Sequence, residues 1–335
     1  MQTLPSATPD LAPFIRTGDR VVCGQAAAEP AVLTAGLAAA HDAVGPFETF
    51  LGAVFSHSFD QAPAGMRFAS YGAMGRASRL ARQGRLDCWP IHYSALEAGF
   101  ASGAIRADVV LIQLARGPGG YSATLANDYV LAAARHARSV IAEINAAAPW
   151  CLGAELDADF RIDLLVETER EPVPLEPAPA GETEARIARH VAALIPDRAT
   201  VQIGIGAIPD AVLGALGSHR GLGIHSGVIG DRVAALVQAG AVTNAHKTVD
   251  PGLTVANVVA GTSLVRDFID KNREVRLRPA GHTHAAAILA AQDNFVAVNS
   301  AIEVDLSGQA NAEVADGMPV GGTGGLLDFT RGARA

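Results

Sequence analysis

The chain has 335 residues, more than one hydrophobic core usually supports, so we expect two domains. Its net charge is -8 and it contains no basic cluster, which argues against nucleic acid as a partner. Hydrophobic residues make up 49% and charged residues 18%, which is ample material for buried sheets.

The cysteines and the first residues indicate in which cellular compartment the protein is expected. Cys23, Cys88 and Cys151 are far apart and odd in number, which fits a reducing compartment better than a disulfide framework. Residues 1–10 lack the charged start and apolar core of a signal peptide, and no apolar run reaches membrane-spanning length. We therefore expect a cytoplasmic protein without a membrane partner.

Runs typical of strands alternate with runs typical of helices along the first half of the chain. Residues 107–114 (ADVVLIQL), for example, form an apolar run of the kind found in buried strands. Such alternation predicts a parallel sheet flanked by helices. We expect strands at 19–22, 48–56, 107–114 and 139–144, and helices at 30–41, 75–83 and 128–137.

One stretch differs in composition from the rest. Residues 167–184 hold four prolines and six glutamates, and such sequence stays extended and solvated. We interpret it as a linker between an N-terminal α/β domain, residues 1–166, and a C-terminal α/β domain, residues 185–335.

The alternation resumes after this linker, so a second α/β layer is expected. Strands are predicted at 200–205, 221–225, 253–260 and 295–304, helices at 184–194, 209–216, 231–238 and 263–272, and a glycine-rich loop at 321–329.

The clearest motif is residues 201–212 (VQIGIGAIPDAV), where an apolar strand runs into Gly204 and Gly206 before a helix near Pro209. Glycines permit a close backbone approach, and a helix start favours an anion such as a pyrophosphate. A tight turn without a ligand is the alternative. Dinucleotide and Walker fingerprints are both incomplete here, since the third glycine and the Gly-Lys-Ser/Thr are missing.

A second motif, residues 223–231 (GIHSGVIGD), lies between a strand and a helix, where open α/β folds bind ligands. His225 is either a hydrogen-bonded structural histidine or an acid–base group. Asp231 is either a helix N-cap or a catalytic acid.

Two further glycine-containing segments are candidates for a ligand site. The backbone N–H groups of residues 321–332 (GGTGGLLDFTRG) are suited to an oxyanion site, unless this is a flexible loop. In residues 24–30 (GQAAAEP), Gly24 and Gln25 would line a pocket mouth, whereas Glu29 would simply cap or precede a helix.

Metal and nucleophile motifs are weak. His282 and His284 share one side of an extended segment and, with His225 and His246, are the only candidate ligands, but no carboxylate or cysteine completes a recognisable spacing. We therefore predict no metal. There is no Gly-x-Ser-x-Gly elbow either.

Taken together, these segments resemble the acetyl-CoA hydrolase/transferase family, in particular the 4-hydroxybutyrate and acetate CoA-transferases. The resemblance spans nearly the whole chain in the family's order. It is carried by residues 17–21, 24–30, 84–94 (GRLDCWPIHYS), 140–145, 202–212, 223–226 (GIHS), 298–309 (VNSAIEVDLSGQ) and 324–333.

The resemblance implies two tandem open α/β/α domains of the CoA-transferase type with the active site between them. It implies coenzyme A or acyl-CoA as ligand and no tightly bound cofactor. In the family a glutamate attacks the acyl-CoA and becomes a glutamyl-CoA thioester. The positions expected to contact the coenzyme are Gly24, Gln25, Gly204, Gly206, Ala207, Ile208, Gly322, Gly324 and Gly325.

The chain departs from the family pattern at active-site positions. Gly227 stands where the resemblance puts the catalytic glutamate, and glycine forms no thioester. The family's Asn-His-Pro aligns with residues 283–285 (THA), and its Gly-Gly-Gln-Val-Asp-Phe with residues 324–329 (GGLLDF). Family members also continue beyond Arg331, so the C-terminal domain is expected to be truncated.

These departures leave three functions open. The first is an acyl-CoA hydrolase or acyl-transfer enzyme without a glutamyl thioester, with His225, Asp231 and Glu303 as acid–base candidates. The second is a non-catalytic subunit that pairs with a homologous glutamate-bearing chain. The third is an orthodox CoA-transferase that uses Glu29 or Glu303. Expected partners are acyl-CoA, a small carboxylic acid, and further copies or a homologous subunit.

Overall fold

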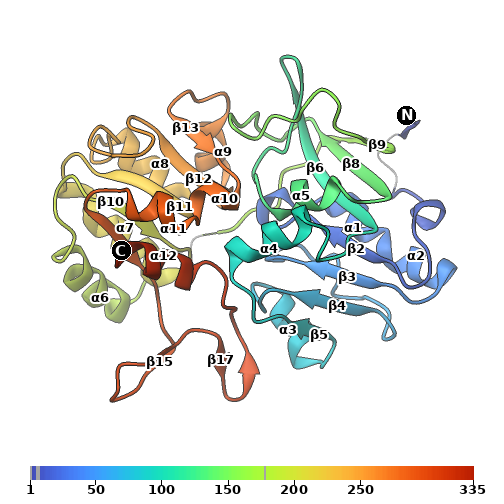
Figure 1. The fold of residues 1–335 in the computed structure, drawn as a ribbon, viewed down its shortest axis with the longest axis horizontal. Helices are drawn as coiled ribbons and strands as arrows, with labels where there is room; N and C mark the ends of the chain where they lie inside the picture. The colour runs from blue at the N-terminus through green and yellow to red at the C-terminus, as the bar shows by residue number, and fades with distance from the viewer. Residues whose placement is uncertain (1, 5–7, 177–178) are drawn as a thin grey trace.

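The computed structural model of the chain describes residues 2–4, 8–176 and 179–335, with side chains from residue 8 onward in these ranges. Two parallel sheets, each flanked by helices, stand side by side (Figure 1). This confirms the predicted α/β class.

The first sheet is built from the N-terminal half of the chain. Its strand order is β1-β9-β8-β6-β2-β3-β4-β5, with all neighbours on this path parallel, and β7 pairs antiparallel with β6. The strands are β1 (Gln2–Leu4), β2 (Arg20–Cys23), β3 (Glu48–Leu51), β4 (Arg67–Ser70), β5 (Leu86–Cys88), β6 (Val109–Gly117), β7 (Gly120–Ser122), β8 (Ser139–Asn145) and β9 (Leu164–Thr168). The helices of this half are α1 (Ala31–Ala35), α2 (Leu37–Val44), α3 (Ala77–Arg82), α4 (Tyr93–Ala101) and α5 (Tyr129–Ala134).

The two faces of this sheet pack into two separate hydrophobic cores. Successive strand residues point to opposite faces. Val21 packs in a core with Leu33 and Leu37 of α1 and α2. Its neighbour Val22 belongs to a second core with Phe100 of α4, and that second core continues into the other half of the molecule.

The second sheet has the order β13-β12-β11-β10-β14, and all its strands are parallel. The strands are β10 (Thr200–Ile203), β11 (Gly223–Ile229), β12 (Thr254–Val259), β13 (Val275–Leu277) and β14 (Phe295–Val298). The helices are α6 (Glu182–Ala192), α7 (Ala207–Ala215), α8 (Asp231–Gln238), α9 (Ser263–Ile269), α10 (Ala280–Thr283), α11 (Ala286–Ala290) and α12 (Leu326–Ala333).

Backbone contacts join the two halves directly. Val259 donates to the carbonyl of Leu125 at 2.8 Å, and Asn127 donates to the carbonyl of Asn257 at 2.9 Å. The end of β12 is therefore fixed against the loop that leads into α5.

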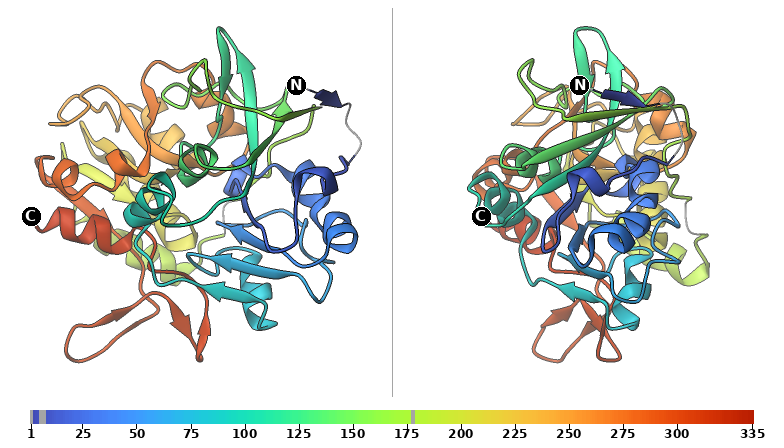
Figure 2. Two further views of the ribbon diagram at one scale, coloured as in Figure 1. Left: turned by 45° about the vertical axis from the view of Figure 1, so that its right-hand side comes forward. Right: turned by 90° about the vertical axis from the view of Figure 1, so that its right-hand side faces the viewer.

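The last part of the chain returns to the first sheet before it ends. Two small hairpins, β15–β16 (Glu303–Val304 with Ala310–Asn311) and β17–β18 (Val314–Ala315 with Met318–Pro319), project from the body (Figures 1 and 2). The Gly321 carbonyl then accepts from the backbone N–H of Ala73 at 2.8 Å, and the Gly324 carbonyl from that of Tyr93 at 2.9 Å. The glycine-rich segment is thus held against the first sheet, and α12 packs on the second.

Several predicted elements need correction. The strand expected at 221–225 runs on to Ile229, because the apolar pair Val228–Ile229 continues the ladder with β12. The strand expected at 295–304 ends at Val298, and the strand expected at 48–56 ends at Leu51. The loop expected at 321–329 becomes helix α12 from Leu326 onward, since the glycines obscured its amphipathic pattern.

The predicted linker at 167–184 overlaps regular structure at both ends. Strand β9 extends to Thr168 and helix α6 begins at Glu182. Residues 177 and 178 lie outside the described residues. Among those described, no helix is both long enough and apolar enough to cross a membrane.

Candidate active site

Two adjoining cavities lie where the two sheets meet. The central cavity has a volume of about 270 Å³ and the side cavity about 230 Å³. Both are bordered by Phe55 from the first half and by Gly204, Ile205, Val228 and Ala260 from the second. A single bent ligand that passes these shared residues could therefore occupy both.

The wall of the central cavity is polar but uncharged. No carboxylate, ammonium, guanidinium or thiol occurs among the described residues that line it. Its polar side chains are Gln25, Tyr71, Tyr93, Gln202, Asn257, His284, Asn299 and Thr323.

Gln25, at the carboxyl end of β2, is the centre of a buried hydrogen-bond network. Its side-chain nitrogen donates to Tyr93 Oη at 2.9 Å and to Asp128 Oδ2 at 2.8 Å. Its oxygen accepts from Tyr71 Oη at 2.6 Å and from the backbone N–H of Ala53 at 3.1 Å. All four hydrogen-bonding positions of the amide are used, so its orientation is fixed.

Tyr93 extends this network across the cavity to the second sheet. Its hydroxyl donates to Asn257 Oδ1 at 2.8 Å, and Asn257 in turn donates to the carbonyls of Asn127 and Arg278. Burial raises the pKa of Tyr93 well above its usual value and raises the pKa of Asp128 to about 6. The tyrosine is therefore a fixed neutral donor.

Gly227 and His284 face one another on the cavity wall. A β carbon built on Gly227 would lie 3.0 Å from His284 Nε2 and 3.3 Å from Phe329 Cε2. The His284 side chain lies between the rings of Tyr93 and Phe329, with centroid distances of 4.8 and 4.5 Å. Burial lowers the pKa of His284 to about 3, so the ring is neutral at neutral pH.

Thr283 contacts the other ring nitrogen of His284. The hydroxyl of Thr283 lies 3.3 Å from the carbonyl of Pro279 and 2.8 Å from His284 Nδ1. If the hydroxyl donates to Pro279 and accepts from Nδ1, the ring proton is on Nδ1 and Nε2 has a free lone pair. If the hydroxyl donates to Nδ1, the ring proton is on Nε2.

The glycine-rich segment closes the cavity opposite β11. A β carbon on Gly322 would lie 2.2 Å from the carbonyl oxygen of Tyr71, and one on Gly325 would lie 2.7 Å from His284 Nε2. Side chains are therefore excluded at both positions. Gly322, Gly324 and Gly325 line the central cavity, and Gly324 forms a parallel β-bridge with His92.

The remaining predicted coenzyme contacts are divided between cavity walls and packing positions. Gly204 borders both cavities and Gly206 borders the side cavity. Ala207 and Ile208 form the first turn of α7, outside both linings. Gly24 packs against the backbone of a neighbouring turn instead, since a β carbon at this position would lie 2.9 Å from the Ala28 carbonyl oxygen.

The three predicted acid–base residues are not brought together. His225 is fully buried, with Nε2 3.1 Å from the Thr283 carbonyl and Nδ1 3.3 Å from the Gln292 amide. Asp231 borders the side cavity but accepts from the backbone N–H groups of Thr262 and Val265. The exposed Glu303 accepts from Asn311 at 3.0 Å and borders neither cavity.

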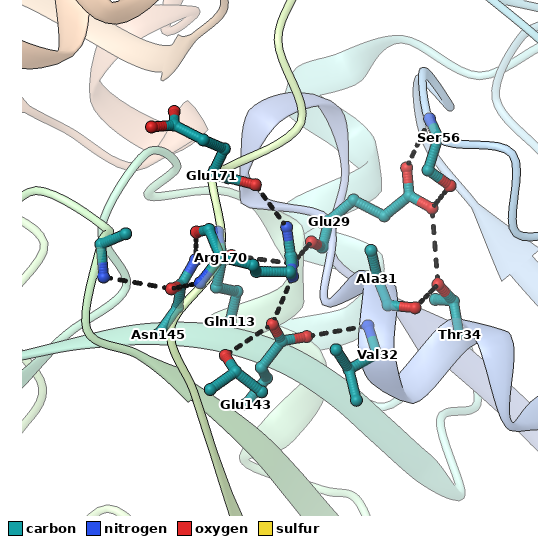
Figure 3. Close-up of polar contacts among 12 residues, drawn as sticks. Glu29, Ala31, Val32, Thr34, Ser56, Gln113, Glu143, Asn145, Arg170 and Glu171 are labelled. Atoms are coloured by element: carbon teal, nitrogen blue, oxygen red, sulfur yellow. Dashed lines mark hydrogen bonds and ion pairs between the residues drawn. The ribbon is translucent and has the colours of Figure 1, made fainter. Parts of the chain in front are cut away.

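Glu29 belongs to a buried polar cluster with Ser56 and Thr34 (Figure 3). Its carboxylate accepts from both the backbone N–H and the hydroxyl of Ser56. Arg170, which follows β9, donates to the Glu29 carbonyl at 2.7 Å and to Glu143 at 2.6 Å. The pKa of Glu29 is raised by burial, and the residue borders neither cavity.

The other histidines considered as metal ligands have separate partners, although the ring of His282 is stacked on that of His225 at a centroid distance of 5.8 Å. His282 pairs with Asp250 at 2.7 Å, while Gly221 packs against His246. Within the described part of the chain, no three His, Cys, Asp or Glu side chains are placed to hold a metal ion.

Sequence analysis missed Tyr71, Tyr93 and Asn257 as functional candidates. Asn257 carries a recognisable signal, because it is a polar residue inside the otherwise apolar strand β12. Tyr93 lies in the segment GRLDCWPIHYS that supported the family resemblance. Tyr71 has no such signal.

Comparisons with known proteins agree with this architecture. Residues 6–176 match the acetyl-CoA hydrolase/transferase N-terminal domain, and residues 261–335 match the corresponding C-terminal domain. The chain is 38% identical over 253 residues to 4-hydroxybutyrate coenzyme A transferase from Clostridium kluyveri, covering 75% of this chain and 59% of that protein. It is 34% identical over 283 residues to succinyl-CoA:acetate/propanoyl-CoA:succinate CoA transferase from Fasciola hepatica. This alignment covers 83% of this chain and 59% of that protein.

Solved structures show the same fold. RipA from Yersinia pestis superposes with a TM-score of 0.88 at 26% identity, covering 99% of this chain and 78% of RipA. The 4-hydroxybutyrate CoA-transferase from Porphyromonas gingivalis superposes with a TM-score of 0.81 at 27% identity, again covering 99% and 78%. The alignments span 59% of the length of the two curated relatives named above.

Proposed function

Because the chain belongs to the acetyl-CoA hydrolase/transferase family, we propose that it binds acyl-CoA between its two sheets and transfers the acyl group without a glutamyl-CoA thioester. The observation that carries this proposal is the uncharged wall of the central cavity around Gly227. A carboxylate nucleophile must reach the thioester carbonyl, and the described wall offers none.

The shapes of the two cavities support a thioester ligand. The walls of the side cavity include Ile203, Leu213 and Val233, which suit an acyl chain or the apolar part of the coenzyme arm. The N–H groups of the glycine-rich segment suit the oxyanion that forms when a thioester carbonyl is attacked. Relatives named as CoA-transferases make acyl-CoA the first ligand to test, and a small carboxylic acid the first acceptor.

The positions of the two alternative glutamates give an orthodox transferase mechanism no support. Glu29 is engaged by Ser56 behind the cavity wall, and Glu303 lies on a projecting hairpin. Either carboxylate would need the chain to rearrange before it reached a thioester in the central cavity.

A non-catalytic subunit remains the second candidate, because one observation favours a partner. Ile302, Val304 and Leu306 on the projecting segment are exposed, and Leu306 has no contact that shields it. Clustered apolar side chains of this kind are typical of interaction surfaces. A homologous glutamate-bearing chain is the partner that this function requires.

One assay separates these functions. The purified protein is incubated with acetyl-, butyryl- or 4-hydroxybutyryl-CoA, with and without acetate, while free thiol and exchanged thioester are measured. We expect thiol release without acetate and no inactivation by borohydride. Acetate-dependent exchange with borohydride inactivation would restore a carboxylate nucleophile. Acyl-CoA binding without either reaction would favour the non-catalytic subunit.

A further inference from the structure

His284 is the only side chain with a basic nitrogen among the described residues that line the central cavity. It is only 4% exposed, and its Nε2 makes no hydrogen bond to another described residue. A ring nitrogen that lines a cavity without a protein partner can bond to a ligand or to water.

The surroundings of His284 fix it in a reactive orientation. Thr283 Oγ1 lies 2.8 Å from Nδ1, where it can accept the ring proton, and the rings of Tyr93 and Phe329 hold the imidazole on either side. With the proton on Nδ1, the lone pair of Nε2 is available on the side of Gly227.

Position 227 has no side chain that could cover Nε2. One carbon on Gly227 would already approach Nε2 to 3.0 Å, so any larger group would displace the imidazole or cover its lone pair. A water molecule bonded to Nε2 therefore lies in the central cavity, which both residues line, and not between the two residues.

We propose that His284, with its ring proton on Nδ1, is the general base of a hydrolytic reaction and that its Nε2 activates a water molecule in the central cavity. This inference rests on the proposed function, and it selects hydrolysis from the reactions that the proposed function allows.

The proposed reaction balances with water as the only co-reactant. The water oxygen attacks the thioester carbonyl carbon while its proton passes to Nε2. The tetrahedral oxyanion then collapses, the C–S bond breaks, and Nε2 returns the proton to the departing sulfur. The products are the free acid and coenzyme A, and the histidine ends the cycle neutral.

The site treats the two charges formed in this step differently. Burial lowers the pKa of His284 and so disfavours the imidazolium, and the rings of Tyr93 and Phe329, at 4.8 and 4.5 Å, partly offset this through their π electrons. The N–H groups of Gly322 and Gly325 lie on the cavity wall, and donors in that position favour the oxyanion.

The test compares His284→Asn with His282→Asn, a control two residues away that removes a histidine paired with Asp250 outside the cavity. Turnover is measured as thiol release from butyryl-CoA, and binding as the Kd for butyryl-CoA. We expect His284→Asn to lower kcat by about 10²-fold or more, since a general base contributes about 10²–10⁴-fold. Its Kd should remain within about threefold of the wild-type value, and His282→Asn should leave both unchanged.

The outcomes separate this inference from the proposed function. Thiol release by wild type with an unaltered kcat in His284→Asn would overturn the role of His284 and leave the proposed function intact. Absence of both thiol release and acyl-CoA binding in wild type would overturn both. If His284→Asn does not fold, His284→Ala with added imidazole decides: recovered turnover supports the base, and no recovery refutes it.

Discussion

Tyr93, on the first half of the molecule, donates a hydrogen bond of 2.8 Å to Asn257 of β12, on the second half. The same hydroxyl accepts from Gln25, whose amide is in turn bonded to Tyr71. All four residues line the central cavity. The cavity wall is therefore also a joint between the two sheets, so the shape of the site depends on how the halves are held together.

Tyr93→Phe tests this joint. Removal of the hydroxyl leaves the Gln25 donor and the Asn257 acceptor without their partner in a buried site. An unsatisfied buried group costs about 1–3 kcal/mol, so we expect the free energy of unfolding to fall by roughly that amount. Urea denaturation measures it. Tyr121→Phe, at a partly exposed position beside Arg116, is the matched control and should change stability by no more than about 0.5 kcal/mol.

Gly227→Ala tests the space beside His284. The added carbon meets His284 Nε2 at 3.0 Å and Phe329 at 3.3 Å, so we expect a loss of about 1–3 kcal/mol from overpacking, together with loss of thiol release. The matched control is Gly214→Ala on the exposed side of α7, where an added carbon meets nothing within 4 Å. Alanine there should stabilise the helix by about 0.5–1 kcal/mol. Full activity in Gly227→Ala would contradict a water site beside Nε2.

Gly227→Glu tests the prediction that position 227 corresponds to the family's glutamate. If His284 moves aside by a few tenths of an ångström, the carboxylate reaches the cavity and should form a borohydride-sensitive thioester with acyl-CoA. Mass spectrometry of the protein after incubation detects this adduct. A folded variant that forms none would show that the cavity has diverged from the family beyond this one residue.

Much of the fold follows from local sequence pattern. Residues 107–114 and 139–144 are apolar runs, and they form the adjacent central strands β6 and β8. Strands β4 and β5 were missed because RFAS and LDC are short and partly polar, so periodicity is too weak to identify them. Tertiary pairing, of β4 with β3 and of β5 with β4, makes them strands rather than local preference.

The site is less predictable because its contacts join distant parts of the chain. The glycine-containing motifs hold Gln25, Gly204 and Gly324, which the structure places on the wall of the central cavity, while their contact with a coenzyme stays a prediction. The bond between Tyr93 and Asn257 spans 164 residues, and no local pattern encodes such a pair. The orientation of His284 likewise depends on the meeting of α10, α12 and β11.

Phe55→Ala tests whether one ligand passes between the two cavities. Phe55 borders both, so truncation of its ring should widen the passage and admit longer acyl chains. We expect the ratio of kcat/KM for hexanoyl-CoA to that for acetyl-CoA to rise by about tenfold, the usual scale of discrimination per methylene group. Phe268→Ala on α9, partly buried but outside both cavities, is the control. An equal change of this kcat/KM ratio in both variants would show that the effect comes from weaker packing of the core and not from the passage between the cavities.

Acid should destabilise the protein partly through His284. Its pKa is about 3 in the folded protein against 6.5 as the ordinary value, because burial disfavours the charged ring. Between these values the unfolded chain binds a proton that the folded chain does not, so stability is lost as pH falls below 6.5. From pH 7 to pH 5 this residue should remove about 2 kcal/mol of unfolding free energy.

The comparison with His284→Asn isolates this contribution. Asp128 acts in the opposite direction, since its pKa is raised to about 6 and its protonation favours the folded state as pH falls. His225, whose pKa is lowered to about 4, acts in the same direction as His284. Both are common to wild type and variant, so the difference between the two proteins reports His284 alone. Urea denaturation at pH 7 and pH 5 should show a drop in stability that is about 2 kcal/mol smaller in the variant. Equal drops of the unfolding free energy in the two proteins would mean that His284 is solvated and protonates as freely as in the unfolded chain. That result would contradict a buried, neutral imidazole at the cavity wall.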